Sequence, residues 1–302
     1  MRIAVYFDRQ RLELIDGRGA SIASYPVSTA SNGPGERYGS QCTPRGLHVV
    51  RAKVGAGSPP NTVFVRRRPT GEVWTSELAS KHPGRDWMLT RILWLSGRES
   101  GFNCGGRVDS LRRKIYIHGA GDDDSIGTPS SHGCVRMCSD DVIELYEHVP
   151  IGTEVDMIES SAQPFTIRVV NWDAERARLQ AVRNSVFIAE QQVPAELEYD
   201  SDDLACRHAL ALDPQAQAIG CARLLRDGSL GRVAVVAAWR GRGVGSALLA
   251  RLMDIARYAG FQRVGLNARS DTCDFYARYG FLPRGEEFVE VGIRHQRMER
   301  AL

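Results

Sequence analysis

A histidine at the end of one strand-like run and a cysteine in a glycine-containing turn could together perform nucleophilic catalysis. The run KIYI ends in His118-Gly119, and the run SHGCVR follows at residues 131–136. The attacking species in such a pair is the Cys134 thiolate, and a neighbouring imidazole takes the thiol proton and later returns it to a leaving amine. Gly133 lets the backbone approach closely, so that the amides of residues 133 and 134 could point at a developing oxyanion. A buried cysteine beside a loop histidine is the structural alternative.

A glycine-rich turn in the second half of the chain is the other candidate site. Residues 240–245 read RGRGVG, directly after the strand-like run GRVAVVA and at the start of a helical pattern. Several backbone N–H groups at the positive end of a helix form an anion site that suits a pyrophosphate. The order of residues differs from the dinucleotide fingerprint, and no Gly-Lys-Ser/Thr follows to make a Walker loop.

Different elements must position these two sites. The first 160 residues read mainly as short strands separated by Gly, Pro, Asn and Ser clusters, with one short helix at SDDVIELYEHV that Ser139 can cap. This half is therefore predicted to be all-β or nearly so. Its strand-like runs are at residues 3–7, 12–14, 46–50, 61–65, 114–119 and 153–158.

The composition of the sequence changes at residues 159–164, which read ESSAQP. The residues of this run are mostly small and polar, as is typical of a linker. A strand at 165–170 and two helical patterns follow, and strand-like runs flank the second helix. This order favours an α+β second domain. We expect domains at 1–160 and 165–302, joined near Gln163-Pro164. The apolar positions at helical spacing are Leu179, Val182 and Val186 in the first helix, and Leu248, Leu252, Ile255 and Ala259 in the second.

Composition excludes several classes of protein. The chain has 302 residues, 43% of them hydrophobic and 25% charged, with a net charge of +3, which argues against long disorder and against nucleic acid as the main partner. We also expect no membrane span, since no run approaches the required apolar length.

The N-terminal run MRIAVYFDRQRLEL lacks an apolar signal-peptide core, and the seven cysteines are odd in number and scattered, which favours a reducing, cytoplasmic location. A periplasmic location stays open if a signal has been removed.

The first half resembles the L,D-transpeptidase catalytic domain of the YkuD type. The similarity rests on IHG, IG-TP, SHGC and VRM, and extends upstream to YPVSTASNG and CTPRGLHVV, so that it covers roughly residues 1–159. The resemblance implies a mainly-β fold and an enzyme that attacks the carbonyl of the L-centre of a diamino acid in a peptidoglycan stem and expels D-Ala. The acyl-enzyme then passes to an amine or to water. The expected partners are therefore muropeptides or peptidoglycan stem peptides.

The same resemblance implies a role for each residue of the motif. Cys134 would be the nucleophile, His118 its base, and Gly119 the residue whose carbonyl orients that base. Ser131 and His132 would shape the pocket, although His132 could instead be a structural hydrogen-bonding residue. Arg136 would meet the substrate's carboxylate or peptide.

The second half resembles the GNAT family of N-acetyltransferases, with an α+β fold and a mixed central sheet. The glycine-rich loop fits the family's acetyl-CoA loop, and DFYARYGF looks like its later helix and turn. The runs VFIAEQQVPAELEYD and GIRHQRM narrow the similarity to a small bacterial subgroup, over residues 165–302. The implied cofactor is acetyl-CoA, and the implied partner is a small amine that accepts the acetyl group.

The resemblance implies that residues Val233 to Val236, including Val235, would pair along the pantetheine. It also implies that Asn267 would lie where two strands splay apart. Tyr276 would lie near the thioester sulfur and could protonate the leaving thiolate. The residues that would cradle the pyrophosphate are Arg240, Gly241, Arg242, Gly243, Val244, Gly245 and Ser246.

Several polar groups have two interpretations. An acidic lining on the acceptor side would favour a cationic amine, but Glu190, Glu196, Glu198 and Asp200 could equally be a solvated loop. His208 and His295 are candidates for the general base or structural residues. Asp122-Asp123-Asp124 reads as a solvated lid rather than a metal site, so no metal is expected, and Arg66-Arg67-Arg68 reads as a solvated turn rather than a glycan-binding strand.

These observations predict a bifunctional enzyme of cell-wall metabolism that combines L,D-peptide acyl transfer with acetyl transfer. The free thiols and acetyl-CoA favour soluble muropeptides as substrates, with carboxypeptidation or D-amino-acid exchange ahead of wall cross-linking. The alternative is an L,D-transpeptidase-type enzyme whose second domain senses acetyl-CoA without catalysis. A secreted cross-linker is a third interpretation.

Overall fold

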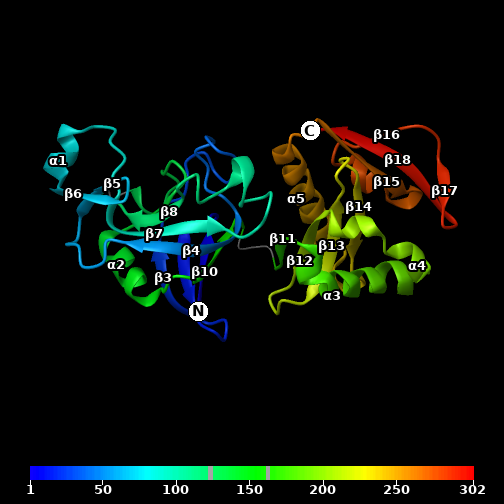
Figure 1. The fold of residues 1–302 in the computed structure, drawn as a ribbon, viewed down its shortest axis with the longest axis horizontal. Coiled ribbons are helices and arrows are strands. Elements are labelled where there is room, and N and C mark those ends of the chain that lie inside the picture. Colours follow the sequence, from blue (N-terminus) through cyan, green and yellow to red (C-terminus); the bar gives the residue numbers. More distant parts are fainter. Residues whose placement is uncertain (122–124, 161–163) are drawn as a thin grey trace. The chain divides into compact units, whose positions relative to one another are not determined.

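The chain folds into two compact units, Met1–Ala162 and Gln163–Leu302. The computed structural model describes residues 1–121, 125–160 and 164–302 (Figure 1). The expected lid at 122–124 and part of the expected linker at 159–164 lie outside these described residues. Each unit is treated by itself below.

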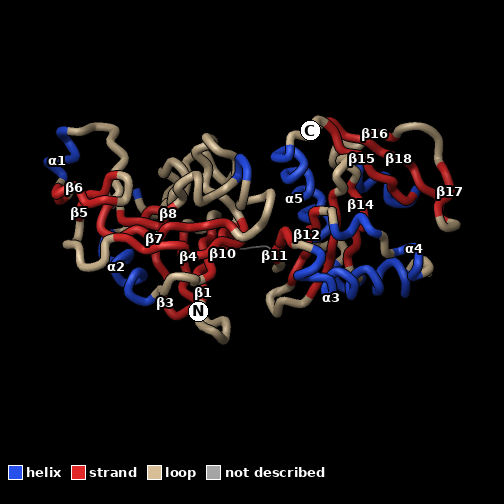
Figure 2. Tube along the Cα trace, in the orientation of Figure 1, coloured by secondary structure: helices blue, strands red, loops and turns tan. Residues whose placement is uncertain are grey.

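The first unit is built around one mixed sheet whose strands run in the order β3-β2-β1-β10-β4-β7-β5-β6, with β8 paired to β7 and β9 paired to β8. Strands and loops make up most of this unit in Figure 2. The strands are β1 (Arg2–Tyr6), β2 (Arg11–Ile15), β3 (Ser21–Pro26), β4 (Gly46–Val54), β5 (Thr62–Val65), β6 (Arg68–Val73), β7 (Leu89–Gly97), β8 (Tyr116–Gly119), β9 (Val135–Met137) and β10 (Glu154–Ile158). The helices are α1 (Ser76–Lys81), a 3-10 turn at Gly106–Val108 and α2 (Ser139–His148).

The core of the first unit determines which side chains remain for chemistry. Ile117, Val135 and Met137 pack in the main apolar cluster, together with Val142 and Leu145 of α2. Successive side chains of a strand point to opposite faces of the sheet. The residues that alternate with these three core positions on β8 and β9 therefore face the other side.

The predicted helix of the first unit is confirmed, but its cap differs from the expectation. Cys138 is the N-cap residue of α2, and Ser139 is already the first helical residue. The Ser139 hydroxyl donates to Asn61 Oδ1 at 2.6 Å and lies 2.7 Å from Thr90 Oγ1. These tertiary partners take the hydroxyl that would otherwise have capped the helix.

The second unit contains two sheets. β11 (Thr166–Val170), β12 (Arg207–Leu212), β13 (Ala218–Leu224) and β14 (Leu230–Val235) form an antiparallel sheet, and β18 (Ile293–Ala301) pairs with β15 (Arg263–Arg269), β16 (Leu282–Pro283) and β17 (Phe288–Glu290). One parallel bridge, Ser229 to Gly265, joins the two where β14 meets β15. Its helices are α3 (Trp172–Arg183), a π-helical segment at Asn184–Glu190, α4 (Ala195–Glu198), α5 (Val244–Ala259) and α6 (Cys273–Ala277), with 3-10 turns at Ser201–Leu204, Ala237–Trp239 and Ser270–Thr272.

The apolar spacing of the two long helices predicts their buried faces correctly, apart from one end. Leu179 and Val182 of α3 are buried, as are Leu248, Leu252 and Ile255 of α5. Ala259 is exposed because α5 ends there, and Gly260 takes the left-handed C-cap conformation.

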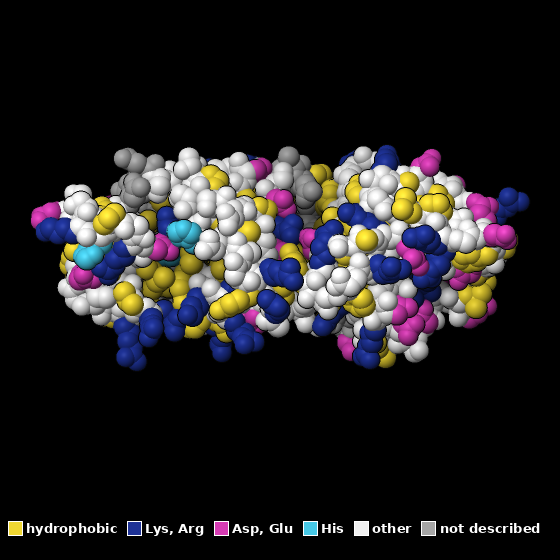
Figure 3. Space-filling model, turned by 90° about the horizontal axis from the view of Figure 1, so that it is seen from above, with side chains coloured by type: hydrophobic (Ala, Val, Ile, Leu, Met, Phe, Trp, Pro, Cys, Tyr) yellow, Lys and Arg dark blue, Asp and Glu magenta, His cyan; other side chains and the backbone are white. Residues whose placement is uncertain are grey.

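On the face of the second unit visible in Figure 3, cationic and acidic side chains are interspersed, in agreement with a net charge of only +3. Among the described residues, no helix has both the length and the apolar composition needed to cross a membrane.

Gly119 provides a test of the contact between β7 and β8. A Cβ at this position would lie 2.8 Å from Leu89 O and 3.1 Å from Thr90 Cβ, so we expect Gly119→Ala to lower the free energy of unfolding by about 1–3 kcal/mol. Urea unfolding measures the change. Gly17→Ala is the control, because a Cβ there meets nothing within 4 Å, and an unchanged Gly119→Ala midpoint would contradict the tight contact.

Candidate active sites

The pairing of β8 with β9 gathers the predicted residues of the first site. The two strands are parallel, and His118 lies opposite Arg136. Cys134 directly precedes β9 and lies two residues before Arg136, so its side chain shares their face of the sheet. Cys134 and Tyr116 indeed pack in a small apolar cluster separate from the main core.

The His118 ring is buried and held in one orientation. Its Nδ1 lies 2.8 Å from the carbonyl oxygen of Gly119. A carbonyl can only accept a hydrogen bond, so Nδ1 carries the proton and Nε2 of the neutral ring keeps a free lone pair. Burial lowers the pKa of His118, although the bond to Gly119 opposes that shift. The ring is thus neutral at physiological pH.

The Cys134 thiol is half-buried and protonated. Burial raises its pKa to about 12, and a backbone hydrogen bond from Tyr116 opposes this rise. Within the described structure, Sγ donates to Lys114 O at 3.6 Å rather than to the His118 ring. Proton transfer to His118 therefore requires a rotation of the thiol toward Nε2, from a resting state in which both groups are neutral.

The turn before Cys134 is held by Ser131. Its buried hydroxyl donates to Cys134 O at 2.5 Å and accepts from the Gly133 amide at 3.2 Å. Gly133 has φ of +126°, a conformation that L side chains rarely adopt. Because the Gly133 N–H is already engaged, the Cys134 amide is the stronger candidate for the oxyanion donor.

Asp86 belongs to this site but carries no signal in the sequence. Its carboxylate accepts from Arg136 Nη2 at 2.6 Å and lies 3.6 Å from His132 Nδ1. The residue lies in the loop between α1 and β7, within the polar run HPGRDW, which has no motif. Only the tertiary fold places it beside the two motif residues.

Two arginines outside the motif also face this region. Arg67, in the β5–β6 turn, donates to the Tyr116 hydroxyl at 2.8 Å and stacks over Trp94 at 4.3 Å. Arg67 is thus half-buried against this cluster, whereas Arg66 and Arg68 are exposed. Arg113 donates to Cys42 O at 2.5 Å and contributes to lowering the pKa of Cys134 against the effect of burial.

The glycine-rich loop of the second unit has the geometry of an anion cradle. Gly241 and Gly243 have φ of +73° and +83°, and a Cβ on either would meet nothing within 4 Å. Gly243 is the N-cap of α5 and offers no side-chain capping bond, so the first amides of the helix are left for a ligand. These features fit the pyrophosphate of acetyl-CoA.

The other loop residues support this cradle. Arg240 donates to Val235 O at 2.9 Å and to Glu190 at 2.5 Å, and Arg242 lies over the Trp239 ring. Val244 is buried beneath the loop. The two remaining positions are Gly245, where a Cβ would lie 3.5 Å from the Phe275 ring, and Ser246, whose hydroxyl accepts from Tyr279 at 2.5 Å.

Next to the loop, β14 and β15 separate. Val236 N–H donates to Ile219 O, and hydrogen bonds alternate along an antiparallel ladder, so the backbone groups of Val235 face the edge toward β15. Val233 and Asn267 line a cavity of about 360 Å³ at this opening. Asn267 thus lies where the prediction puts it relative to β14, and its role at a splay between strands stays a prediction.

Tyr276 lines the same cavity. Its ring packs edge-to-face against Phe275 at 5.0 Å, and burial raises the pKa of Tyr276 to about 12. The phenol stays protonated at neutral pH and can donate a hydrogen bond to a developing thiolate, but it is a weaker acid than an ordinary tyrosine.

The charged lining of this cavity is mainly basic, contrary to an acidic acceptor side. Its charged side chains and its one histidine are Glu198, Arg223, Arg232, Arg269, Glu290, His295 and Arg297. The four arginines come from β13, β14, β15 and β18. Such separation along the chain explains why sequence reasoning missed them.

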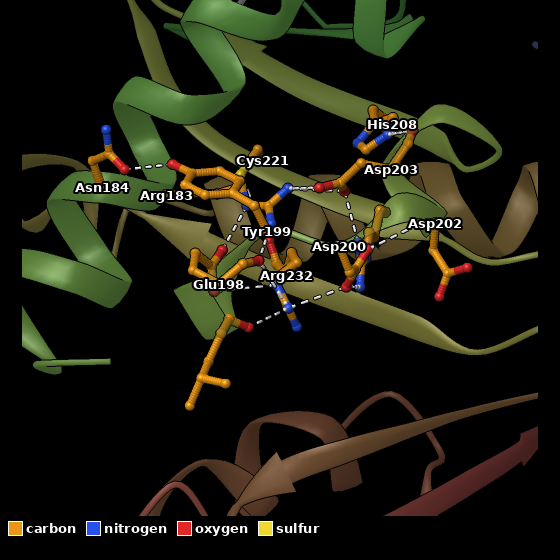
Figure 4. A network of polar contacts seen from close by, with 12 residues as sticks. Arg183, Asn184, Glu198, Tyr199, Asp200, Asp202, Asp203, His208, Cys221 and Arg232 are labelled. Atoms are coloured by element: carbon orange, nitrogen blue, oxygen red, sulfur yellow. Dashed lines mark hydrogen bonds and ion pairs between the residues drawn. The ribbon is translucent and has the colours of Figure 1, made fainter. Parts of the chain in front are cut away.

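The acidic residues expected on the acceptor side have different surroundings. Glu198 and Asp200 belong to a network of ion pairs with arginines (Figure 4). Glu190 pairs with Arg240, and Glu196 is exposed on α4. His208 is buried with Nε2 2.8 Å from Asp203 O, whereas His295 reaches the cavity.

The described residues contain no group of three or more His, Cys, Asp or Glu side chains arranged to hold a metal ion. The Asp122-Asp123-Asp124 run lies outside those residues.

Comparison with known proteins identifies a family for each half of the chain. The L,D-transpeptidase catalytic domain family (YkuD) matches residues 1–157, and the GNAT acetyltransferase domain family matches residues 165–302. The chain is 34% identical over 121 residues to the uncharacterized N-acetyltransferase YjcF of Bacillus subtilis, covering 39% of this chain and 86% of that protein. It is 28% identical over 151 residues to the probable L,D-transpeptidase YbiS of Escherichia coli, covering 44% of this chain and 47% of YbiS.

Solved structures include an acyl-CoA N-acyltransferase from Pseudomonas aeruginosa, with 31% identity and a TM-score of 0.41, covering 45% of this chain and 98% of that one. The family matches define a fusion of two transferase domains. The chain belongs to the L,D-transpeptidase catalytic domain family through residues 1–157 and to the GNAT acetyltransferase family through residues 165–302.

The two pKa shifts of the first site predict its pH dependence. A thiol with a pKa near 12 gains thiolate with each step in pH up to that value, so alkylation of Cys134 by iodoacetamide should accelerate about tenfold per pH unit from 7 to 10. Peptide mass spectrometry measures labelling at Cys134. In the urea-unfolded chain the same thiol should level off near pH 8.5.

A plateau near neutral pH in the folded protein would instead show a preformed thiolate–imidazolium pair. The lowered pKa of His118 adds a second expectation: the base stays neutral as pH falls through 6.5, so the acidic limb of the catalytic rate should lie below that value.

Proposed function

We propose that the first domain, residues 1–160, catalyses cysteine acyl transfer at an L,D-peptide bond of muropeptide stems. The observation that supports this most directly is the placement of Cys134 and His118 on one face of two paired strands, with His118 Nδ1 held by Gly119 O. This arrangement leaves Nε2 as the base. The family match to residues 1–157 supports the reaction class.

In the proposed reaction His118 Nε2 takes the Cys134 proton while Sγ attacks the carbonyl carbon of the diamino acid's L-centre. The C–S bond forms, the C–N bond to D-Ala breaks, and His118 returns the proton to the leaving amine. An amine or a water molecule then attacks the thioester, with His118 accepting its proton. The Cys134 amide would stabilise the oxyanion.

Arg136 and Asp86 would set the substrate's position. Asp86 is half exposed and holds the Arg136 guanidinium at 2.6 Å, which fixes the cation on the catalytic face. A guanidinium held in this way can donate to a stem carboxylate in a defined orientation.

The second domain, residues 165–302, would transfer an acetyl group to an amine. When acetyl-CoA is bound, its thioester supplies the activated acetyl group. The amides at the start of α5 and the loop from Arg240 to Ser246 would hold the pyrophosphate. The edge of β14 at Val233 and the Val235 amide would pair with the pantetheine, since Val235 O already accepts from Arg240. Tyr276 would donate a hydrogen bond to the sulfur as the amine attacks.

A cytoplasmic location is the part of the proposal that unites both activities. Acetyl-CoA is made and held inside the cell, and the seven cysteines of the chain are free thiols. Soluble muropeptides are therefore the proposed substrates, with D-Ala release to water or exchange ahead of cross-linking.

Cys134→Ala tests the first activity. Incubation of the intact protein with a disaccharide-tetrapeptide should release D-Ala, and the substitution should abolish that release because no acyl-enzyme can form. Mass spectrometry of the muropeptide detects the product. Cys104→Ala is the matched control, since Cys104 is also half-buried with a pKa raised by burial. Equal release by both variants would refute the assignment.

Tyr276→Phe tests the second activity. We expect the variant to keep its thermal shift with CoA and to lose about a hundredfold in amine-dependent CoA release, because the sulfur loses its hydrogen-bond donor. A thiol-reactive dye measures the released CoA, and Tyr258→Phe on α5 is the control. A wild-type protein that binds CoA but releases none with any amine would instead favour the non-catalytic module.

A further inference from the structure

The floor of the cavity in the second unit contains a buried cation with one unused donor. Arg223 is 4% exposed, and its terminal nitrogens are held by Asp200 and Asp203 at 2.7 Å. Its Nε is buried and has no hydrogen-bond partner within the described structure. A buried donor without a partner is costly, so an oxygen atom of a ligand in this cavity would be stabilised there.

The surrounding ion pairs hold Arg223 in place. Arg183 donates to Glu198 at 2.6 Å and to Asp203 at 2.8 Å, and Arg232 lies 3.2 Å from Glu198 (Figure 4). These carboxylates are shared among three arginines and are thus committed to cations of the protein. They are poorly placed to recognise a cationic substrate.

Access to Arg223 Nε runs past a glycine. Gly231, opposite Arg223 on the neighbouring strand, also lines the cavity. A Cβ at position 231 would have Arg223 Nε as its nearest neighbour, at 3.8 Å. The absent side chain therefore leaves room for about one methyl-sized group beside the buried Nε.

A second cation lines the cavity from the other sheet. Arg297 of β18 lies opposite Asn267 of β15, and both line the cavity. Its Nε is 3.4 Å from Glu299, but Arg263 and Arg284 also approach that carboxylate, at 3.8 and 3.7 Å. One carboxylate cannot neutralise three guanidinium groups, so the charge of Arg297 is only partly balanced.

We infer that the acetyl acceptor is an amine that also carries a carboxylate, bound by Arg223 Nε and Arg297. This inference rests on the proposed acetyl transfer and narrows its substrate class to amino acids and peptides with a free carboxylate. In the reaction the acceptor nitrogen forms a C–N bond to the acetyl carbon, the C–S bond of acetyl-CoA breaks, and the amine loses one proton while CoA leaves as the thiol. The carboxylate takes no part in the bond changes.

The test compares acceptors that differ only in the carboxylate. Lysine and cadaverine form one pair, and D-alanine and D-alaninamide form the other; CoA release by the full chain is measured for each. We expect kcat/KM to be at least about tenfold higher for the carboxylate-bearing member of at least one pair, since charge-assisted hydrogen bonds are of that strength.

Two variants test which residues bind the carboxylate of the acceptor. Arg297→Gln should raise KM for the preferred acceptor about tenfold while leaving KM for the matched amine without a carboxylate unchanged. Arg263→Gln is the control, because it removes the same charge near Glu299 from a residue outside the cavity. Gly231→Ala should also raise KM for the carboxylate alone while keeping every charge, and thermal melting checks that each variant folds.

The outcomes separate the inference from the function on which it rests. No CoA release with any of the four amines would remove the acetyl-transfer proposal itself. Equal or faster turnover of cadaverine and D-alaninamide than of their carboxylate partners would overturn the inference and leave acetyl transfer intact. A carboxylate preference that survives both Arg297→Gln and Gly231→Ala would overturn the assigned binding residues.

Discussion

The parallel pairing of β8 with β9 is the contact on which the first site depends. It turns Ile117 and Val135 into the core and brings His118, Cys134 and Arg136 to the opposite face. Gly119 permits the close approach of β8 to β7 and also provides the carbonyl that orients the His118 ring. A single short strand therefore anchors the sheet and sets the tautomer of the imidazole.

Burial then decides the protonation states of the proposed catalytic groups. It raises the pKa of Cys134 and of Tyr276 and lowers the pKa of His118, so all three are neutral at physiological pH. A neutral thiol beside a neutral base avoids the cost of a buried charge until substrate arrives. In the second unit buried charges are present, and ion pairs offset the free-energy cost of burying them. Arg183 and Arg223 are buried as cations among carboxylates.

The separation of β14 from β15 is the corresponding constraint in the second unit. One bridge at Ser229 and Gly265 holds the strands together, and the cavity opens beyond it. The same opening brings Tyr276 and the basic wall to one space. Charge balance on the whole chain conceals this local excess, since net charge carries no information about where ion pairs form.

The sequence by itself determined both families, the mainly-β and α+β classes and the motif residues around Cys134 and Arg240. It could do so because each motif is a contiguous run whose turn geometry depends on nearby glycines. Only the tertiary structure placed Asp86 beside Arg136 and gathered Arg223 and Arg297 around one cavity. Those residues come from loops and strands far apart in the chain, and no local pattern records which distant carboxylate neutralises a given arginine. Long-range packing decides that, and it also decides which donor stays unpaired.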